Sequence, residues 1–398
     1  MGLRSAKIRL LAVLLVLVMV AALAGCGGKP ESKEPIKIGG IFDITGGTGD
    51  VVKPYSEGAT DYFKYLNEKG GINGRKVELI GIDYAYKIPQ AVDAYNKLTK
   101  QDKVVAILGW GTGDTEAMVK FITQDKIPFI SGSYSEHLLN IQTNPYNFLV
   151  AQSYSDQARM VLKWIKDNWK DGSRKPKVAL IYNDSGFGKS PIEDTKKYAT
   201  ENGIDLVDEE IVALTALEAT SQLLNLQKKE PDFALIQETS NATATVLKDA
   251  KKLGLKTRFV GLNWASDEKA VKLAESAAEG YIGVIPFAFP YEDVPGMKAL
   301  KDFNQAKGKN WDERNQKYVQ GWVSAMVMAE GIKRAGKDIT GEGIRKGLES
   351  MNKVDLGGLA APITFTAQSH RGAVQSKLYE VKNGKFQPIS DWLKAPGR

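Results

Sequence analysis

Apolar and polar residues follow one another along most of this chain in a pattern that switches between strand and helix. The pattern is most complete in residues 104–135. The apolar runs at 104–108 and 129–130 are typical of buried strands in a parallel sheet. Between these runs, apolar residues recur at helical spacing, which predicts one helix face packed on that sheet. The residues of this face are Ala117, Met118, Phe121 and Ile122.

The rest of the chain repeats this order. We expect strands at 36–42, 76–84 and 147–152 and helices at 57–69, 89–101 and 155–168, with Pro54 delaying the first helix. After the turn at 171–176, strands are expected at 178–183, 205–212, 233–237, 258–262 and 281–286 and helices at 191–201, 219–228 and 242–253. Helices at 295–306, 315–335 and 341–350 and strands at 363–366 and 377–381 follow. This alternation predicts an α/β fold in two parts, with parallel sheets covered by helices on both faces.

Two turns of the first part leave the same edge of the predicted sheet. They are Gly-Trp-Gly-Thr-Gly at 109–113 and Ser-Gly-Ser-Tyr-Ser at 131–135. In an open α/β sheet, this edge is where ligands bind. Glycines let the backbone approach a ligand, and hydroxyls with free N–H groups at a helix start suit an anion. Two ordinary turns between strand and helix would show the same pattern, so that alternative stays open.

The first 25 residues are expected to be a signal peptide rather than part of the fold. Three basic residues precede an apolar run at 10–23, whose 14 residues are too short to span a bilayer comfortably. The run ends in Leu-Ala-Gly-Cys, which resembles the bacterial lipobox, where cleavage precedes an acylated cysteine; here that residue is Cys26. A membrane anchor helix is the alternative. Residues 26–35 are polar and contain two prolines, as expected of a tether.

Composition narrows the function further. The chain has 398 residues, a length that suggests two or more domains, and its formal net charge is +7. Basic and acidic residues alternate, so nothing favours a nucleic-acid partner. Cys26 is the only cysteine, which excludes an internal disulfide. His137 and His370 lie far apart without a Cys or His companion, so no metal or other cofactor is expected.

A nucleotide-dependent enzyme is the rival class. Its best support is the turn DSGFGKS at 184–190, which ends like a phosphate-binding loop. However, Asn183 stands where such a loop needs glycine, and the glycines at 46–49 lack the third glycine of a dinucleotide fingerprint. The chain also lacks the G-x-S-x-G signature of serine hydrolases. The sequence therefore favours a protein that is not an enzyme.

A family resemblance rests on several short motifs in a fixed order. They are IKIG at 36–39 with Thr45-Gly46, NEKGGINGR at 67–75, VAILG at 105–109, IPFIS at 127–131, GFG at 186–188, AKKLGL at 250–255 and the stretch 318–329. Together they span nearly all of 36–387. In this the chain resembles the type I periplasmic solute-binding proteins of ABC transporters, branched-chain amino acid (Leu/Ile/Val-binding) group, in a lipoprotein form.

The resemblance implies two doubly wound Rossmann-like lobes joined by a three-segment hinge, with crossings near 150–154, 285–289 and 354–363. The N-lobe would comprise residues 36–150 plus 290–355, and the C-lobe residues 151–289 plus 356–398. It also implies an exported monomer, lipid-anchored at Cys26 beside an ABC permease.

The resemblance also places a ligand between the lobes. In the family, N-lobe turns hold the ligand carboxylate; the matching positions here are Trp110, Thr112, Gly113, Asp114, Ser133, Tyr134 and Ser135. In the C-lobe, Phe187 stands where the family usually has Tyr, and the acidic residue that binds a substrate ammonium falls at the neutral Asn263. Glu238 could supply the missing charge. An N-lobe position that is often Tyr falls near Val51.

These departures leave the ligand open. Trp110, Tyr134, Phe187 and Trp264 lie on candidate cleft turns, and stacked rings suit a flat or larger apolar ligand. The leading hypothesis is a binding protein that captures a branched-chain or other amino acid, or a related carboxylate, by hinge closure and delivers it to a permease. The alternatives are a sensing protein for an amide, urea or aromatic acid, and, less favoured, the nucleotide-dependent enzyme.

Overall fold

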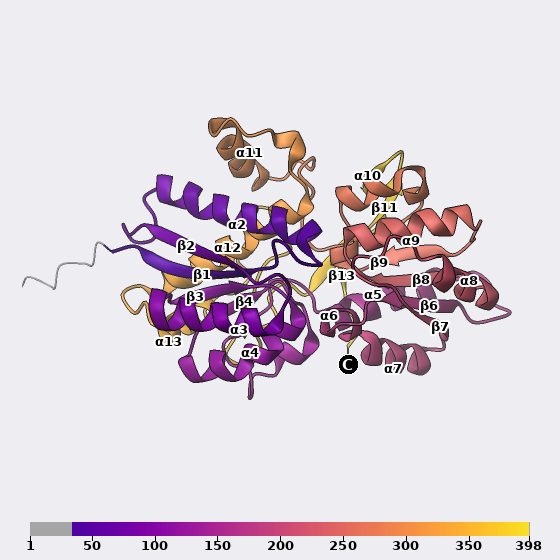
Figure 1. Cartoon of the computed structure of the whole chain (residues 1–398), viewed down its shortest axis with the longest axis horizontal. Coiled ribbons are helices and arrows are strands. Elements are labelled where there is room, and N and C mark those ends of the chain that lie inside the picture. The colour runs from indigo at the N-terminus through magenta and orange to yellow at the C-terminus, as the bar shows by residue number, and fades with distance from the viewer. Residues whose placement is uncertain (1–33, 398) are drawn as a thin grey trace, which may run out of the picture. The chain divides into compact units, whose positions relative to one another are not determined.

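The computed structural model describes residues 34–397, and the chain divides into two units, Met1–Pro35 and Ile36–Arg398. The second unit contains two sheets, each with helices on both faces (Figure 1). We call the first sheet with its helices the N-lobe and the second the C-lobe. Cys26 and the predicted signal peptide lie outside the described residues.

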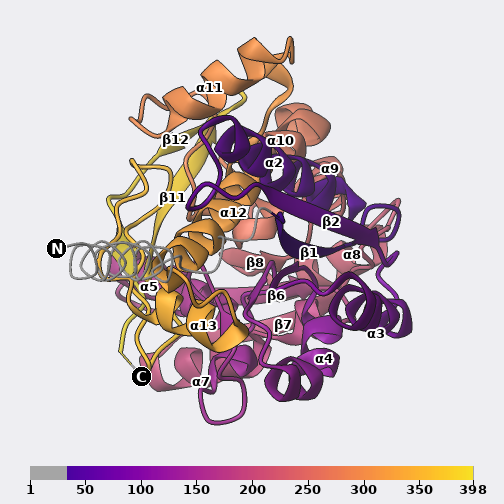
Figure 2. The same cartoon turned by 90° about the vertical axis from the view of Figure 1, so that its left-hand side faces the viewer.

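The N-lobe sheet has five parallel strands. In spatial order they are β2 (Val77–Asp83), β1 (Ile36–Phe42), β3 (Ala106–Gly109), β4 (Phe129–Ser131) and β5 (Asn147–Phe148). One face carries α2 (Gly49–Glu68), α12 (Gln316–Ala335) and α13 (Gly341–Glu349), and the other carries α3 (Ile88–Asn96) and α4 (Thr112–Asp125), as Figures 1 and 2 show. This is the doubly wound arrangement that the alternation predicted.

The C-lobe sheet is mixed. Its order is β12 (Lys385–Pro388), β11 (Gln375–Lys382), β10 (Ile282–Ile285), β9 (Arg258–Gly261), β8 (Phe233–Gln237), β6 (Lys177–Tyr182) and β7 (Asp205–Ile211), with β13 (Leu393–Lys394) on β11. Strands β6 to β10 are parallel, whereas β11 runs antiparallel to β10 and β12. The helices are α5 (Tyr154–Asn168) and α7 (Ile192–Asn202) on one face and α8 (Thr220–Lys229), α9 (Ser240–Lys252) and α10 (Glu268–Ala274) on the other.

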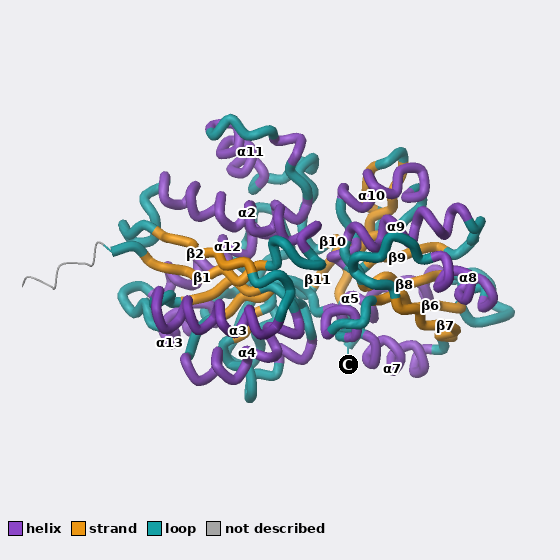
Figure 3. Tube along the Cα trace, in the orientation of Figure 1, coloured by secondary structure: helices purple, strands orange, loops and turns teal. Residues whose placement is uncertain are grey.

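Three segments connect the lobes, at 149–153, 286–296 and 350–374, and Figure 3 shows them as loops. They are tied to one another by backbone hydrogen bonds. The Leu149 amide donates to the His370 carbonyl over 3.1 Å, and the Ala288 amide donates to the Leu359 carbonyl over 2.8 Å. The His370 ring is buried and stacks on Phe148. The three connecting segments are therefore hydrogen-bonded to one another and form a single hinge.

The structure corrects the expected start of the first helix. Helix α2 begins at Gly49 and contains Pro54, which does not delay it. A proline removes the hydrogen bond to the carbonyl four residues earlier, which here belongs to Asp50. The Lys269 side chain donates to that carbonyl over 3.5 Å, so the freed acceptor has a partner.

Other expectations about elements also need correction. Of the four apolar residues expected on the packed face of α4, Met118 and Ile122 are buried, whereas Ala117 and Phe121 are exposed. The expected strand at 363–366 is replaced by isolated bridges, and the strand expected at 147–152 ends at Phe148. The short helices α6 (Gly186–Lys189) and α10 were not expected.

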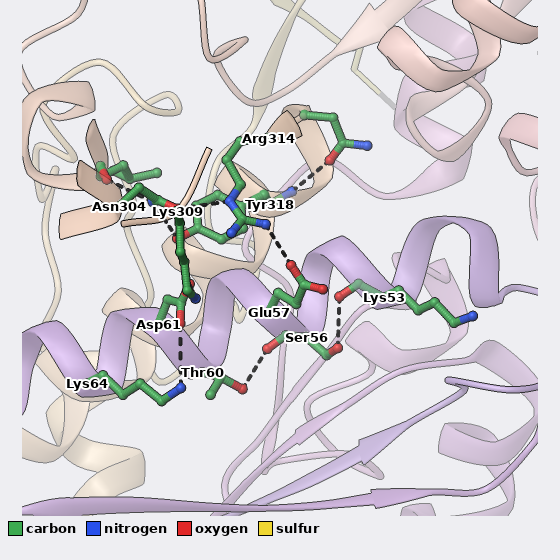
Figure 4. A network of polar contacts seen from close by, with 12 residues as sticks. Lys53, Ser56, Glu57, Thr60, Asp61, Lys64, Asn304, Lys309, Arg314 and Tyr318 are labelled. Atoms are coloured by element: carbon green, nitrogen blue, oxygen red, sulfur yellow. Dashed lines mark hydrogen bonds and ion pairs between the residues drawn. The ribbon is translucent and has the colours of Figure 1, made fainter. Parts of the chain in front are cut away.

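A polar network fastens helix α11 (Met297–Ala306) and the turn after it to α2 (Figure 4). Buried Asp61 on α2 accepts hydrogen bonds from the Tyr318 hydroxyl, over 3.0 Å, and from Lys309. Arg314 donates to Glu57 over 2.8 Å and to the Asn304 side chain over 2.9 Å. These contacts fix the start of α12, which carries residues that reach the other lobe.

Helices α2 and α12 cross at two glycines, which leads to a stability prediction. A Cβ on Gly321 would lie 1.8 Å from the Tyr55 carbonyl oxygen, and one on Gly58 would lie 2.0 Å from the Tyr318 carbonyl oxygen. Gly321→Ala is expected to lower the free energy of unfolding by about 1–3 kcal/mol, because the backbones must separate. Gly172→Ala, where no atom lies within 4 Å, is the control. Equal urea midpoints for the two variants would contradict this packing.

Candidate functional site

A small cavity lies at the carboxyl ends of the strands of both sheets. Its lining comes from segments that follow β1 to β6, β8 and β9: Thr48, Val51, Tyr86, Trp110, Gly111, Thr112, Gly132, Tyr154, Phe187, Thr239 and Trp264. Carboxyl strand ends are the general ligand position of open α/β sheets. Both lobes therefore contribute to one cavity at the expected edge.

The N-lobe wall is held by hydroxyl groups. The Trp110 indole donates to the Thr48 hydroxyl over 2.7 Å, and that hydroxyl donates to the Asp43 carboxylate over 2.7 Å. The turns after β3 and β4 are joined by the hydroxyls of Thr112 and Ser133, which lie 2.6 Å apart. The backbone of the wall is thus fixed before any ligand binds.

The C-lobe wall is attached to the N-lobe through Trp264. Its indole N–H donates to the Gly132 carbonyl over 3.1 Å and lies 3.0 Å from the Tyr154 hydroxyl. The Tyr154 hydroxyl also lies 3.4 Å from the Gly132 carbonyl oxygen. Because a carbonyl oxygen has two lone pairs, these two donors occupy both acceptor positions of the Gly132 carbonyl oxygen.

Aromatic rings make up much of the lining. The ring centroids of Trp110 and Trp264 lie 4.7 Å apart, edge to face, and those of Tyr154 and Phe187 lie 5.5 Å apart in the same arrangement. Tyr86 completes the set of five lining rings. Such edge-to-face pairs are the favoured geometry of aromatic side chains, so the rings support one another around the cavity.

The two lobes touch beside the cavity, so the structure is closed. The Asn241 amide, in the first turn of α9, donates to the Asp50 carboxylate of α2 over 2.8 Å. A Cβ on Gly186 would lie 3.5 Å from the Cα atom of Gly113. Lys317 of α12 reaches into the C-lobe and donates to the carbonyls of Asn263 and Ser266.

Of the ten residues that the sequence suggested, three line the cavity: Trp110, Thr112 and Phe187. The backbone of Gly113 packs against Gly186. The Ser133 hydroxyl is hydrogen-bonded to the Thr112 hydroxyl behind the lining. The Tyr134 ring is fully buried and stacks on Trp264, and its hydroxyl accepts from Gln320 over 2.7 Å.

Ser135 and Asp114 also point away from the cavity. The Ser135 hydroxyl donates to Glu116 over 3.2 Å. Asp114 caps α4 by accepting from the Gly111 amide over 3.2 Å. Burial raises the pKa of the Asp114 carboxyl to about 7, despite hydrogen bonds that favour its charged form.

The two C-lobe candidates for a charged contact lie outside the lining as well. Asn263 is fully buried. Its side-chain oxygen accepts from the Gln157 side-chain amide, and its backbone N–H donates to the Gln157 side-chain oxygen. Glu238 is fully buried beside the lining residue Thr239, and one of its oxygens accepts from Asn183 over 3.2 Å. Burial raises the pKa of the Glu238 carboxyl.

Charges near the cavity are mostly acidic. Burial, and to a smaller extent the nearby carboxyl of Asp50, raises the pKa of the Glu238 carboxyl, and burial also raises the pKa of Asp50. The cation closest to the rings is Lys317, whose ammonium lies 5.2 Å from the Trp264 ring centre. Burial lowers the pKa of Lys317 to about 8.

The turn at 184–190 is filled by its own chain. A Cβ on Gly188 would lie 1.9 Å from the Asn183 carbonyl oxygen, and Lys189 pairs with Asp184. These glycines are explained by close packing rather than by a phosphate. Within residues 34–397, no group of three His, Cys, Asp or Glu side chains could hold a metal ion. Nor does that range contain a helix long and apolar enough to cross a membrane.

Sequence reasoning missed part of the lining. Thr48, Tyr86, Tyr154 and Thr239 were not singled out, although each follows the carboxyl end of a strand. The signal was available, because the rule applied to the turns after β3 and β4 holds for every parallel strand.

This fold and this cavity define a two-lobed solute-binding protein. A family model described as periplasmic binding protein matches residues 35–385. The chain therefore belongs to the periplasmic binding protein family, which consists of solute-binding proteins.

Individual relatives agree with this assignment. The leucine-, isoleucine-, valine-, threonine- and alanine-binding protein of Pseudomonas aeruginosa is 24% identical, over 79% of this chain and 83% of its own length. The structure of a branched-chain amino acid ABC transporter protein from Thermus thermophilus with bound valine is 28% identical, covers 91% of this chain and 97% of that one, and has a TM-score of 0.85. An ABC transporter substrate-binding protein from Aeropyrum pernix is 30% identical, covers 92% and 97%, and also has a TM-score of 0.85.

Proposed function

We propose that this protein is the substrate-binding lipoprotein of an ABC importer and that it captures a small amino acid or a related carboxylate. The observation that carries the proposal is a single cavity whose walls come from both lobes. The Thermus thermophilus protein, which has this fold, holds valine. The chain's role is to bind and deliver, not to catalyse.

Hinge closure is the proposed means of capture. The solute meets the N-lobe wall at Trp110 and Thr112, and the C-lobe then closes Phe187 and Thr239 over it. A ligand shifts the balance between open and closed forms only by its extra affinity for the closed one. A membrane permease would then recognise the closed protein.

The domain limits belong to the same proposal. The N-lobe is assigned residues 36–150 plus 290–355 and the C-lobe residues 151–289 plus 356–398. Residues 1–25 are assigned as a signal peptide, with the mature chain exported and anchored through a lipid on Cys26. The anchor is tested by proteolysis of the purified lipoprotein and mass spectrometry of its N-terminal peptide, which should begin at Cys26 and carry the mass of the lipid.

Two substitutions test the site by isothermal titration with valine. Thr112→Val removes a lining hydroxyl at constant shape and is expected to lower affinity at least about tenfold, as for a hydrogen bond to a charged group. Ser135→Ala is the matched control, because its hydroxyl bonds to Glu116 behind the lining, and it should change affinity less than about twofold. An unchanged affinity in Thr112→Val, or an equal loss in both, contradicts this site.

A further inference from the structure

The cavity lining combines a high aromatic content with no cationic side chain. Among the described residues, eleven line the cavity. Five of these are Tyr, Trp or Phe, and none is Lys, Arg or His. Aromatic faces attract organic cations, and cages of such rings are the usual sites for methylated ammonium groups. The lining therefore suits a positively charged, poorly hydrated group better than a bare anion.

The hydrogen-bonding capacity of the lining separates two kinds of ammonium. A primary ammonium carries three donors and needs about three acceptors. The Gly132 carbonyl is saturated by Trp264 and Tyr154, and the Thr48 hydroxyl already accepts from Trp110. A fully methylated ammonium has no N–H group and needs no acceptors, and its methyl groups can lie against the rings.

From these two observations we infer that the solute held in this cavity carries a fully methylated ammonium group, packed against the rings of Trp110, Tyr154 and Phe187. Thr112 remains available to the solute's polar end. The inference rests on the proposed function and narrows its substrate class to N-methylated zwitterions. Trp264 contributes less, because Lys317 already lies against its ring.

Two probes of the same shape test the inference by titration of the full chain. Trimethylglycine has a positively charged nitrogen at the branch point where 3,3-dimethylbutanoate has a neutral carbon. Any difference between their affinities therefore reports the positive charge. Trimethylglycine is expected to bind at least about tenfold more tightly. Phe187→Leu should weaken trimethylglycine about fivefold and leave 3,3-dimethylbutanoate within about twofold. Trp169→Leu, outside the lining, is the control and should change neither.

The outcomes separate this inference from the proposed function. Equal or tighter binding of 3,3-dimethylbutanoate overturns the inference, as does an equal effect of Phe187→Leu on both probes. If valine binds and trimethylglycine does not, the inference fails while the proposed function stands. If neither probe nor valine binds, both fail.

Discussion

A disulfide between residues 113 and 186 is expected to hold the two lobes closed and to slow hydrogen exchange at the Asn241 amide at least about a hundredfold. The Cα atoms of the two glycines lie within about 5 Å, since a Cβ on Gly186 would be 3.5 Å from the Cα of Gly113. That separation suits an unstrained disulfide. The amide of Asn241 has one partner, Asp50 of the other lobe, and is free whenever the lobes part.

The magnitude follows from the populations. If the closed form without ligand is a minor state of about 1%, the Asn241 amide exchanges almost freely in the unmodified protein. The double variant Gly113→Cys with Gly186→Cys would be made in a Cys26→Ser background, because Cys26 is the only native cysteine. Exchange measured by NMR should be slow after oxidation and fast again after reduction.

Each single cysteine variant is the control and should exchange like the parent. If the double variant forms the disulfide but Asn241 exchanges at the same rate as in the parent, the lobes do not open and close about this hinge. If the disulfide does not form in solution, the closed arrangement is not sampled.

The fold could be predicted from the sequence because its signal is carried by repeated local patterns. Each parallel strand is an apolar run, and each helix has one apolar face, so α/β alternation is visible without tertiary information. Pro54 misled the prediction, because local propensity cannot show that Lys269 of the other lobe would bond to the freed Asp50 carbonyl. Likewise, nothing local distinguishes Phe121, which is exposed, from Met118, which is buried.

The site could be located but not resolved from the sequence. The turns after β3 and β4 do border the cavity, yet only Trp110, Gly111, Thr112 and Gly132 of these turns line it. Whether a turn residue faces a cavity or its own core depends on its partners in space. Tyr134 faces inward because its hydroxyl accepts a hydrogen bond from Gln320 and its ring stacks on Trp264. Both partners are more than one hundred residues away in the sequence.

Several turn glycines are explained in the same way by packing. A Cβ on Gly109 would lie 1.9 Å from the Phe129 ring, and one on Gly111 would lie 2.2 Å from the Asp114 carboxylate. The sequence pattern suggested that these glycines admit a ligand. In the structure both glycines lie against neighbouring side chains, and of the two only Gly111 also lines the cavity.

Asp114→Asn is expected to remove a large part of the pH dependence of stability. Burial raises the pKa of the Asp114 carboxyl to about 7, whereas an unfolded Asp titrates near 4. The native state therefore binds more protons than the unfolded state between these values, so stability falls as pH rises from about 4 to 7. The loss through this group is about 4 kcal/mol, at roughly 1.4 kcal/mol for each pKa unit.

The asparagine variant keeps the geometry and loses the titration. Its carbonyl oxygen can accept from the Gly111 amide as Asp114 does, and its amide can donate to the Tyr84 hydroxyl, which is nearby. Urea unfolding of both proteins from pH 4 to 8 should give similar stabilities at pH 4 and a more stable variant at pH 8. Asp171→Asn is the control: the pKa of this exposed carboxyl is lowered by hydrogen bonds from Ser173, so it is ionised throughout this range and its removal should leave the slope unchanged. Parallel curves for the native protein and Asp114→Asn would show that Asp114 is not buried as a neutral acid, and the N-terminus of α4 would then be open to solvent.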